Sequence, residues 1–205
     1  FIKLFSILKK EYHLLSPDII KAENNGITIT LVKGKKSEAR FINPKTGEMI
    51  TLTYNPGESK TQTANQKPDN VLELGKLGTD ISYKYVFDAK YRIENNPKSV
   101  FYPDENPGPK VEDINTMHRY RDSIVYENPK SKFTFEKTMF GAYVLFPYDD
   151  ENKYAESESF KNGKHIKGHK FYRSIDTVNI GGLPFLPGAT SLVQKLLTDL
   201  INDSK

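Results

Sequence analysis

The sequence predicts an α/β fold in which a mixed central β-sheet is flanked by α-helices. Amphipathic helical patterns occupy both ends of the chain, in 1–15 and 191–201. Between them, short segments alternate apolar and polar residues and are bounded by turn-forming residues, which is typical of strands. The 205 residues suit a single domain, with a helix and β-meander in 1–65 and the main core in 66–205. Because the chain begins without methionine in mid-pattern, we expect it to be a fragment of a longer protein.

Composition and the absence of several motifs argue against a number of protein classes. The absence of cysteine rules out disulfides, thiolate catalysis and Cys-based zinc sites. The sequence has no Walker phosphate loop, dinucleotide fingerprint or Gly-x-Ser-x-Gly string, so an NTPase, a Rossmann oxidoreductase and a serine hydrolase are poorly supported. No apolar run is long enough for a membrane helix, and we expect a cytoplasmic protein. The net charge of +4 permits nucleic-acid binding without demonstrating it.

The N-terminal third predicts a helix followed by strands. Apolar residues recur at helical spacing over Phe1–Leu15. Alternating patterns over Gly26–Gly34, Ser37–Asn43 and Glu48–Tyr54 predict a three-stranded meander. The polar, Pro- and Gly-containing segment 55–67 predicts a loop.

The next segment predicts an antiparallel hairpin with polar residues at its open end. One strand begins near Asp69, a Gly-punctuated turn covers Gly75–Asp80, and the return strand ends near Asp88. Since the two ends of a hairpin are neighbours, Asp69, Asp88 and Lys90 can converge. Asp88 and Lys90 share one face of the strand because side chains alternate. The simpler interpretation is a surface ion pair at a strand end.

Two carboxylates and a lysine at one point suit a hard divalent cation. Mg²⁺ is typically held by one or two carboxylates together with water and phosphate oxygens. Such an ion lowers the pKa of a bound water and offsets charge on a phosphodiester. The Lys90 ammonium could orient that water or neutralise the phosphate.

Pro68-Asp69 followed by Asp88-Ala89-Lys90 resembles the PD-(D/E)xK motif of the restriction-endonuclease-like nuclease superfamily. The strings Phe87–Arg92 and Glu112–Asp122 are similar to the C-terminal nuclease domain of McrC-like and LlaI-like restriction proteins. The resemblance covers about residues 66 to 190. It implies a restriction-endonuclease-like fold.

The resemblance also implies a function and a set of roles. It implies a metal-dependent endonuclease cutting DNA, the cleavage module of a restriction system that could be modification-dependent. Catalysis is assigned to Asp69, Asp88 and Lys90. Binding of Mg²⁺, for which Mn²⁺ could substitute, is assigned to Asp69, Asp88 and Ala89. An AAA+ GTPase or ATPase partner is expected, and a homodimer is one option. The superfamily often has a metal-binding glutamate on its first helix, but Glu11 does not match and is not assigned that role.

Two other functions stay open: an inactive nuclease-fold scaffold or binding domain, and a nuclease acting on RNA. The intact motif argues against the first, and nothing in the residues separates DNA from RNA.

A helix predicted over Val111–Tyr126 carries the cationic residues expected to bind DNA phosphates. These are His118, Arg119 and Arg121, together with Arg92 just after the hairpin. In the alternative interpretation, Arg121 pairs with an acid of the same helix, Asp113 or Asp122, and only braces it.

The C-terminal part predicts two strands, a charged loop and a helix. Strands are expected over Thr138–Phe146 and Phe171–Ile180. The charged segment Tyr148–Lys170 is interpreted as a basic loop near DNA. An amphipathic helix over Ser191–Ile201 closes the fold.

Overall fold

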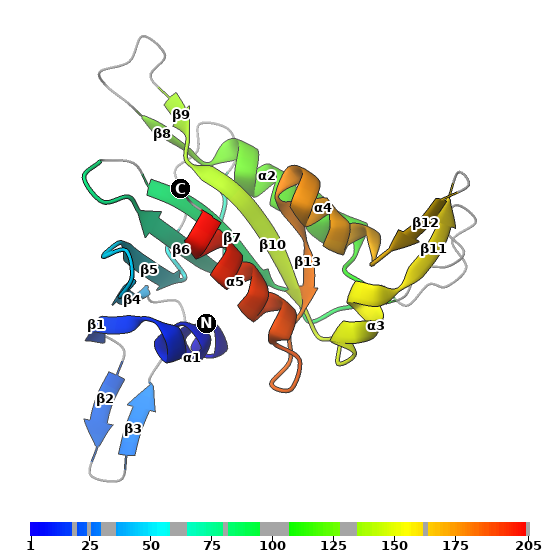
Figure 1. Cartoon of the computed structure of the whole chain (residues 1–205). Helices are drawn as coiled ribbons and strands as arrows, with labels where there is room; N and C mark the ends of the chain where they lie inside the picture. The colour runs from blue at the N-terminus through cyan, green and yellow to red at the C-terminus, as the bar shows by residue number, and fades with distance from the viewer. Residues whose placement is uncertain are drawn as a thin grey trace. The chain divides into compact units, whose positions relative to one another are not determined.

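The structure, a computed structural model, describes residues 1–17, 20–23, 26–29, 36–57, 65–79, 82–94, 107–127, 135–161 and 164–203. Its helices and strands are labelled in Figure 1. The helices are α1 (Ile2–Glu11), α2 (Val111–Ser123), α3 (Glu151–Glu156), α4 (Lys170–Val178) and α5 (Ser191–Asp203). Within the described residues, none of the helices combines the length and apolar character that crossing a membrane requires.

Seven strands form one mixed sheet, and six shorter strands pair in three separate ribbons. The sheet strands are β1 (His13–Pro17), β4 (Ser37–Ile42), β5 (Met49–Tyr54), β6 (Asn70–Gly75), β7 (Ser82–Ala89), β10 (Met139–Phe146) and β13 (Ile180–Pro184), in the order β1-β4-β5-β6-β7-β10-β13. The ribbon strands are β2 (Ile20–Glu23), β3 (Gly26–Ile29), β8 (Val125–Glu127), β9 (Phe135–Lys137), β11 (Glu158–Lys161) and β12 (Lys164–Lys167). Pairs from β1 to β7 are antiparallel, and β10 pairs with β13 in parallel. The predicted α/β fold is therefore confirmed.

The chain divides into two compact units, and the first contains the hairpin as far as Phe87. This unit comprises 1–87 and 122–140, and the second comprises 88–121 and 141–203. In the first, the apolar side of α1 packs on the sheet, with the rings of Phe5 and Phe41 5.6 Å apart. Both side chains are buried, so the amphipathic pattern of the helix supplies this core.

The predicted hairpin is present as β6 and β7. Register runs from Gly75 opposite Ser82 to Asn70 opposite Phe87. The buried Asn70 amide donates a hydrogen bond from Nδ2 to the Phe87 carbonyl at 3.0 Å. This bond fixes the open end of the hairpin, where the motif residues lie.

In the second unit, α4 and α5 pack on β13. Strands β10 and β13 pair from Ala142 opposite Ile180 to Phe146 opposite Pro184. A Cβ on Gly181 would lie 2.1 Å from the Phe171 carbonyl oxygen, so α4 can approach this strand only at a glycine.

Two predictions in the N-terminal part were wrong. The helix ends at Glu11 rather than Leu15, because Tyr12 is already extended and the chain continues into β1. Strand β1 pairs with β4 and takes the outer place expected for the strand over Gly26–Gly34. The described part of that strand, β3, pairs with β2 in a separate ribbon.

Three predictions further along the chain also need correction. The expected strand Phe171–Ile180 is mainly helix α4, whose ends are capped by His169 and by Asn179 in the left-handed conformation. The expected loop Tyr148–Lys170 contains α3 and the β11–β12 ribbon. The helix expected to reach Tyr126 ends at Ser123, because the β-branched and aromatic residues after it form β8.

Candidate active site

The end of β7 carries a buried carboxylate beside a lysine. Asp88 is 1% exposed, and the Lys90 ammonium lies 2.5 Å from its Oδ2. The two residues share a face of the strand, as the alternation predicted. The contact is a close ion pair rather than an aligned hydrogen bond. The backbone N–H of Lys90 donates to the Leu145 carbonyl of β10 at 2.8 Å, which fixes the lysine main chain.

Burial separates this pair from an ordinary surface ion pair. Removing a carboxylate from water costs several kcal/mol, and a single ammonium offsets only part of that cost. A strand end in contact with water would give the same ion pair without burying Asp88. The arrangement therefore places the Asp88 carboxylate out of water with the Lys90 ammonium against it.

Asp69 lies in the first compact unit, directly before the register pair of Asn70 and Phe87. Its side chain is half-buried, and its carbonyl accepts a hydrogen bond from Asn55 N–H at 2.8 Å. Asp88, in the second unit, directly follows the same register pair along the chain. Ala89, the last residue of β7, is half-buried.

The donor chemistry of the motif fits magnesium. The side-chain donors are carboxylate oxygens, which hard divalent cations prefer. Among the described residues, no group of three or more His, Cys, Asp or Glu side chains could hold a metal ion. A magnesium site does not need such a cage, because Mg²⁺ keeps several waters and takes substrate phosphate oxygens.

The arginine after the motif is bound to helix α2. Arg92 donates through Nη2 to Oδ1 of Asp113 at 2.5 Å and through Nε to Oδ2 at 3.1 Å. Asp113 is 1% exposed in the first turn of the helix, and Glu112 lies 3.5 Å from the same guanidinium. The hydrogen bonds and charge of Asp113 raise the pKa of Arg92. The pair ties the segment after β7 to α2 by a bidentate fork.

Sequence reasoning missed the role of Asp113 toward Arg92. It interpreted this acid only as one of two partners for Arg121. The available signal was the acid itself, in the first turn of a predicted helix, but the partners are 21 positions apart in the sequence, so no local pattern shows the contact.

The remaining cationic residues of α2 differ in their surroundings. His118 is half-buried, whereas Arg119 is exposed and donates to the Thr116 hydroxyl at 2.8 Å. Arg121 donates through Nη1 to the Val178 carbonyl, at the last residue of α4, at 2.7 Å. This contact supports a bracing role for Arg121, through a different acceptor from the two acids considered in the sequence.

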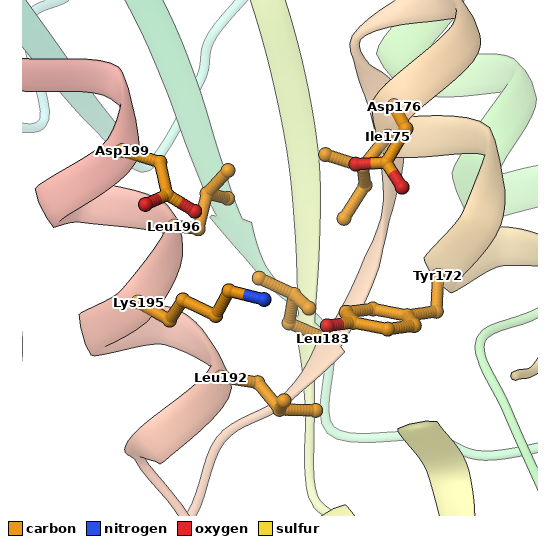
Figure 2. Close-up of a pocket in the computed structure, with 8 residues that line it drawn as sticks. All are labelled: Tyr172, Ile175, Asp176, Leu183, Leu192, Lys195, Leu196 and Asp199. Atoms are coloured by element: carbon orange, nitrogen blue, oxygen red, sulfur yellow. The ribbon is translucent and has the colours of Figure 1, made fainter. Parts of the chain in front are cut away.

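A small pocket in the second unit is lined by residues that do not belong to the motif. It is formed between α4 and α5, over Leu183 of β13 (Figure 2). Ile175 and Leu192 add apolar walls, and Lys195 extends its amine from α5 toward α4. Neither Asp88 nor Lys90 lines this pocket, so it is not the site that the motif predicts.

Comparison with known proteins gives a family match. A family model described as the PD-(D/E)XK nuclease superfamily matches residues 1–151, a span that includes the hairpin, the motif and α2. No curated protein and no solved structure matches the chain. The match supports the superfamily resemblance, and the closer resemblance to McrC-like and LlaI-like proteins stays a prediction.

Proposed function

Because the chain belongs to the PD-(D/E)XK nuclease superfamily, we propose that it is a metal-dependent endonuclease that hydrolyses DNA phosphodiester bonds. The observation that carries this proposal is the buried Asp88 carboxylate with the Lys90 ammonium 2.5 Å away, inside the segment that matches the family. The family supports nuclease chemistry, and the buried charge pair supplies the site at which it would occur.

The metal would be held by the carboxylates of Asp69 and Asp88 and by the carbonyl of Ala89. The hairpin register supports this assignment, because Asp69 precedes and Asp88 follows one pair of opposed residues. Mg²⁺ is the expected ion, and Mn²⁺ would substitute for it. When bound, the ion supplies positive charge that activates water and offsets charge on the phosphodiester.

Lys90 has two roles in this proposal. In the free protein, its ammonium neutralises the buried Asp88 carboxylate. With substrate bound, its three N–H donors can orient the attacking water and stabilise the negative charge that develops on the phosphate. An ammonium cannot ligate a metal, so Lys90 acts on the water and the phosphate and does not join the ligand set.

Helix α2 would contribute contacts to the DNA backbone. Phosphate contacts position a duplex without reading its sequence, which suits a cleavage module. His118 and Arg119 are our first candidates for these contacts. Arg92 is bound to the buried Asp113 and Arg121 to the last carbonyl of α4, so in our proposal their main role is to hold the motif segment and the helix in place. The acceptor of Arg119 is a hydroxyl of its own helix, so its contact ties no second element to α2.

The biological setting is proposed from the resemblance alone. It supports a cleavage module of a restriction system, with a separate AAA+ GTPase or ATPase as partner and with modification of the target as one possible trigger. A homodimer would allow both strands to be cut.

Cleavage of supercoiled plasmid DNA tests the proposed function. We expect nicked and linear products with Mg²⁺ and with Mn²⁺, none with EDTA, and none from Asp88→Asn, which keeps the shape of the side chain and removes its charge. A closed circle has no ends, so any product establishes endonuclease activity. Intact plasmid together with a cleaved circular RNA would favour the RNA-directed alternative. Binding of DNA without cleavage under all these conditions would favour the inactive scaffold.

A further inference from the structure

The β11–β12 ribbon of the second unit lies apart from the sheet strands β10 and β13 (Figure 1). The two strands pair antiparallel from Glu158 opposite Lys167 to Lys161 opposite Lys164. Lys164, His165 and Lys167 are exposed. A two-stranded ribbon is only marginally stable by itself. Its second strand, β12, has three exposed residues and a half-buried Ile166, so the position of the ribbon needs support from outside it.

The base of the ribbon supplies that support, because it is built on a buried aromatic pair. Tyr154 of α3 is fully buried, stacks on His169 at 4.7 Å and donates to the Gly182 carbonyl of β13 at 2.9 Å. Gly168, which has a φ of +87°, donates from its N–H to the Ser157 carbonyl at 2.7 Å. The ribbon is therefore anchored at its base, while Glu158, Lys164 and Lys167 are exposed to solvent.

The ribbon segment is basic, and the segment directly before it is acidic. Residues 158–170 contain four lysines and one glutamate, a net charge of +3 with neutral histidines. Residues 149–156 contain four acids and one lysine, a net charge of −3. Lys164 and Lys167 are three positions apart on one strand, so their side chains leave opposite faces of the ribbon. Both faces of the ribbon thus carry positive charge.

We propose that the β11–β12 ribbon binds duplex DNA by lying in the major groove, with Lys164 and Lys167 on phosphates of the two strands. This inference rests on the proposed function, since it takes DNA as the substrate. The major groove of B-form DNA admits a two-stranded ribbon and presents phosphates on both of its sides. An acidic protein surface would meet only one face of the ribbon. The deep, narrow major groove of an RNA duplex would not admit it.

The salt dependence of duplex binding tests the ribbon. Affinity is measured by fluorescence anisotropy in EDTA for the parent chain and for Lys164→Gln/Lys167→Gln. Each lost phosphate contact reduces the slope of log K against log salt by about 0.9, so we expect the slope to fall by about 2. Lys9→Gln/Lys10→Gln, on exposed positions of α1, is the matched control and should keep the parent slope.

A third variant tests the same contacts in the opposite direction. Glu156 lies 3.5 Å from the Lys167 ammonium, and both side chains are 65% exposed. Glu156→Gln removes this competing charge and should raise the affinity for duplex DNA. Equal slopes in the ribbon and control double variants, in proteins with the same circular dichroism and melting temperature, would overturn the inference.

Cleavage of the same duplex by the parent chain separates the two proposals. A parent chain that cuts the duplex in Mg²⁺, while the ribbon variant keeps the parent slope, overturns the ribbon inference and leaves the nuclease proposal standing. A parent chain that binds no duplex overturns both. Equal loss of affinity for duplex RNA and duplex DNA in the ribbon variant would also contradict placement in a B-form groove.

Discussion

At the scale of single residues, burial gives the motif its chemical meaning. Pattern alone placed Asp88 and Lys90 on one face of a strand and left a surface ion pair as the simpler interpretation. The structure adds that the carboxylate is 1% exposed, which no local pattern predicts because burial depends on the strands packed around it. The fork between Arg92 and Asp113 was hidden for the same reason, since its partners come from separate elements.

Replacing Lys90 tests its proposed role. Lys90→Gln removes the positive charge, so we expect cleavage to fall by about 10²-fold or more, the size of losing one donor to a transition-state charge. Mn²⁺ binding should persist, because the ammonium is not a ligand. Single-turnover cleavage and calorimetric titration with Mn²⁺ give the two readings. Cleavage at the parent rate would remove Lys90 from the mechanism.

At the scale of elements, the hairpin was predictable and α4 was not. The turn residues and alternation of the β6–β7 segment agree with each other, so local and tertiary preferences coincide. Phe171–Ile180 is rich in aromatic and β-branched residues, which favour a strand. Its caps decided otherwise: the His169 side chain accepts from Phe171 N–H at 3.2 Å, and Asn179 ends the helix with a φ of +56°. Asn179 was the signal in the sequence that indicated a helix end.

The cap of α4 predicts a pH-dependent stability. Burial, with Lys170 and Arg173 adding repulsion, lowers the pKa of His169 to about 4. In the unfolded chain the pKa is about 6.5, so between these values the unfolded state binds a proton that the folded state does not. The contribution of neutral His169 to the free energy of unfolding is then complete above pH 6.5. It is lost as the pH falls toward 4, by up to about 3 kcal/mol.

Urea unfolding at pH 7.5, 6 and 5 measures this loss. His169→Asn keeps a capping oxygen and does not titrate, so its free energy of unfolding should fall less steeply with pH than that of the parent. The comparison uses the slopes against pH, because the smaller side chain also leaves space beside Gly108. Parallel pH profiles for the two proteins would show that His169 is not the titrating group.

Helix α2 allows a matched comparison of two arginines. Arg121 caps the last carbonyl of α4, so Arg121→Ala should lower the free energy of unfolding by about 1 kcal/mol and leave the salt slope of DNA binding unchanged. Arg119 is exposed, so Arg119→Ala should leave the melting temperature nearly unchanged and reduce the slope by about 1. A reduced slope for Arg121→Ala at an unchanged melting temperature would instead assign Arg121 to the phosphates.

At the scale of the whole molecule, the order of the sheet could not be predicted from the sequence. Each strand pattern near the N-terminus was compatible with a meander, but the partner of β4 was β1 from the end of the helical pattern, not the strand starting at Gly26. Pairing between distant segments depends on how the whole core closes, and local alternation contains no information about it. The pairing of β6 with β7 could be predicted because a short turn joins the two strands.

Mn²⁺ binding by the parent chain and by single-site variants tests whether Asp69 and Asp88, which adjoin one register pair, hold the same ion. The binding is followed by electron paramagnetic resonance of free Mn²⁺. We predict that Asp69→Ala and Asp88→Ala each lose the site occupied in the parent chain. The control Asp199→Ala, at an exposed position of α5, should keep it. Parent-like Mn²⁺ binding by Asp69→Ala or by Asp88→Ala would contradict a shared metal at the motif.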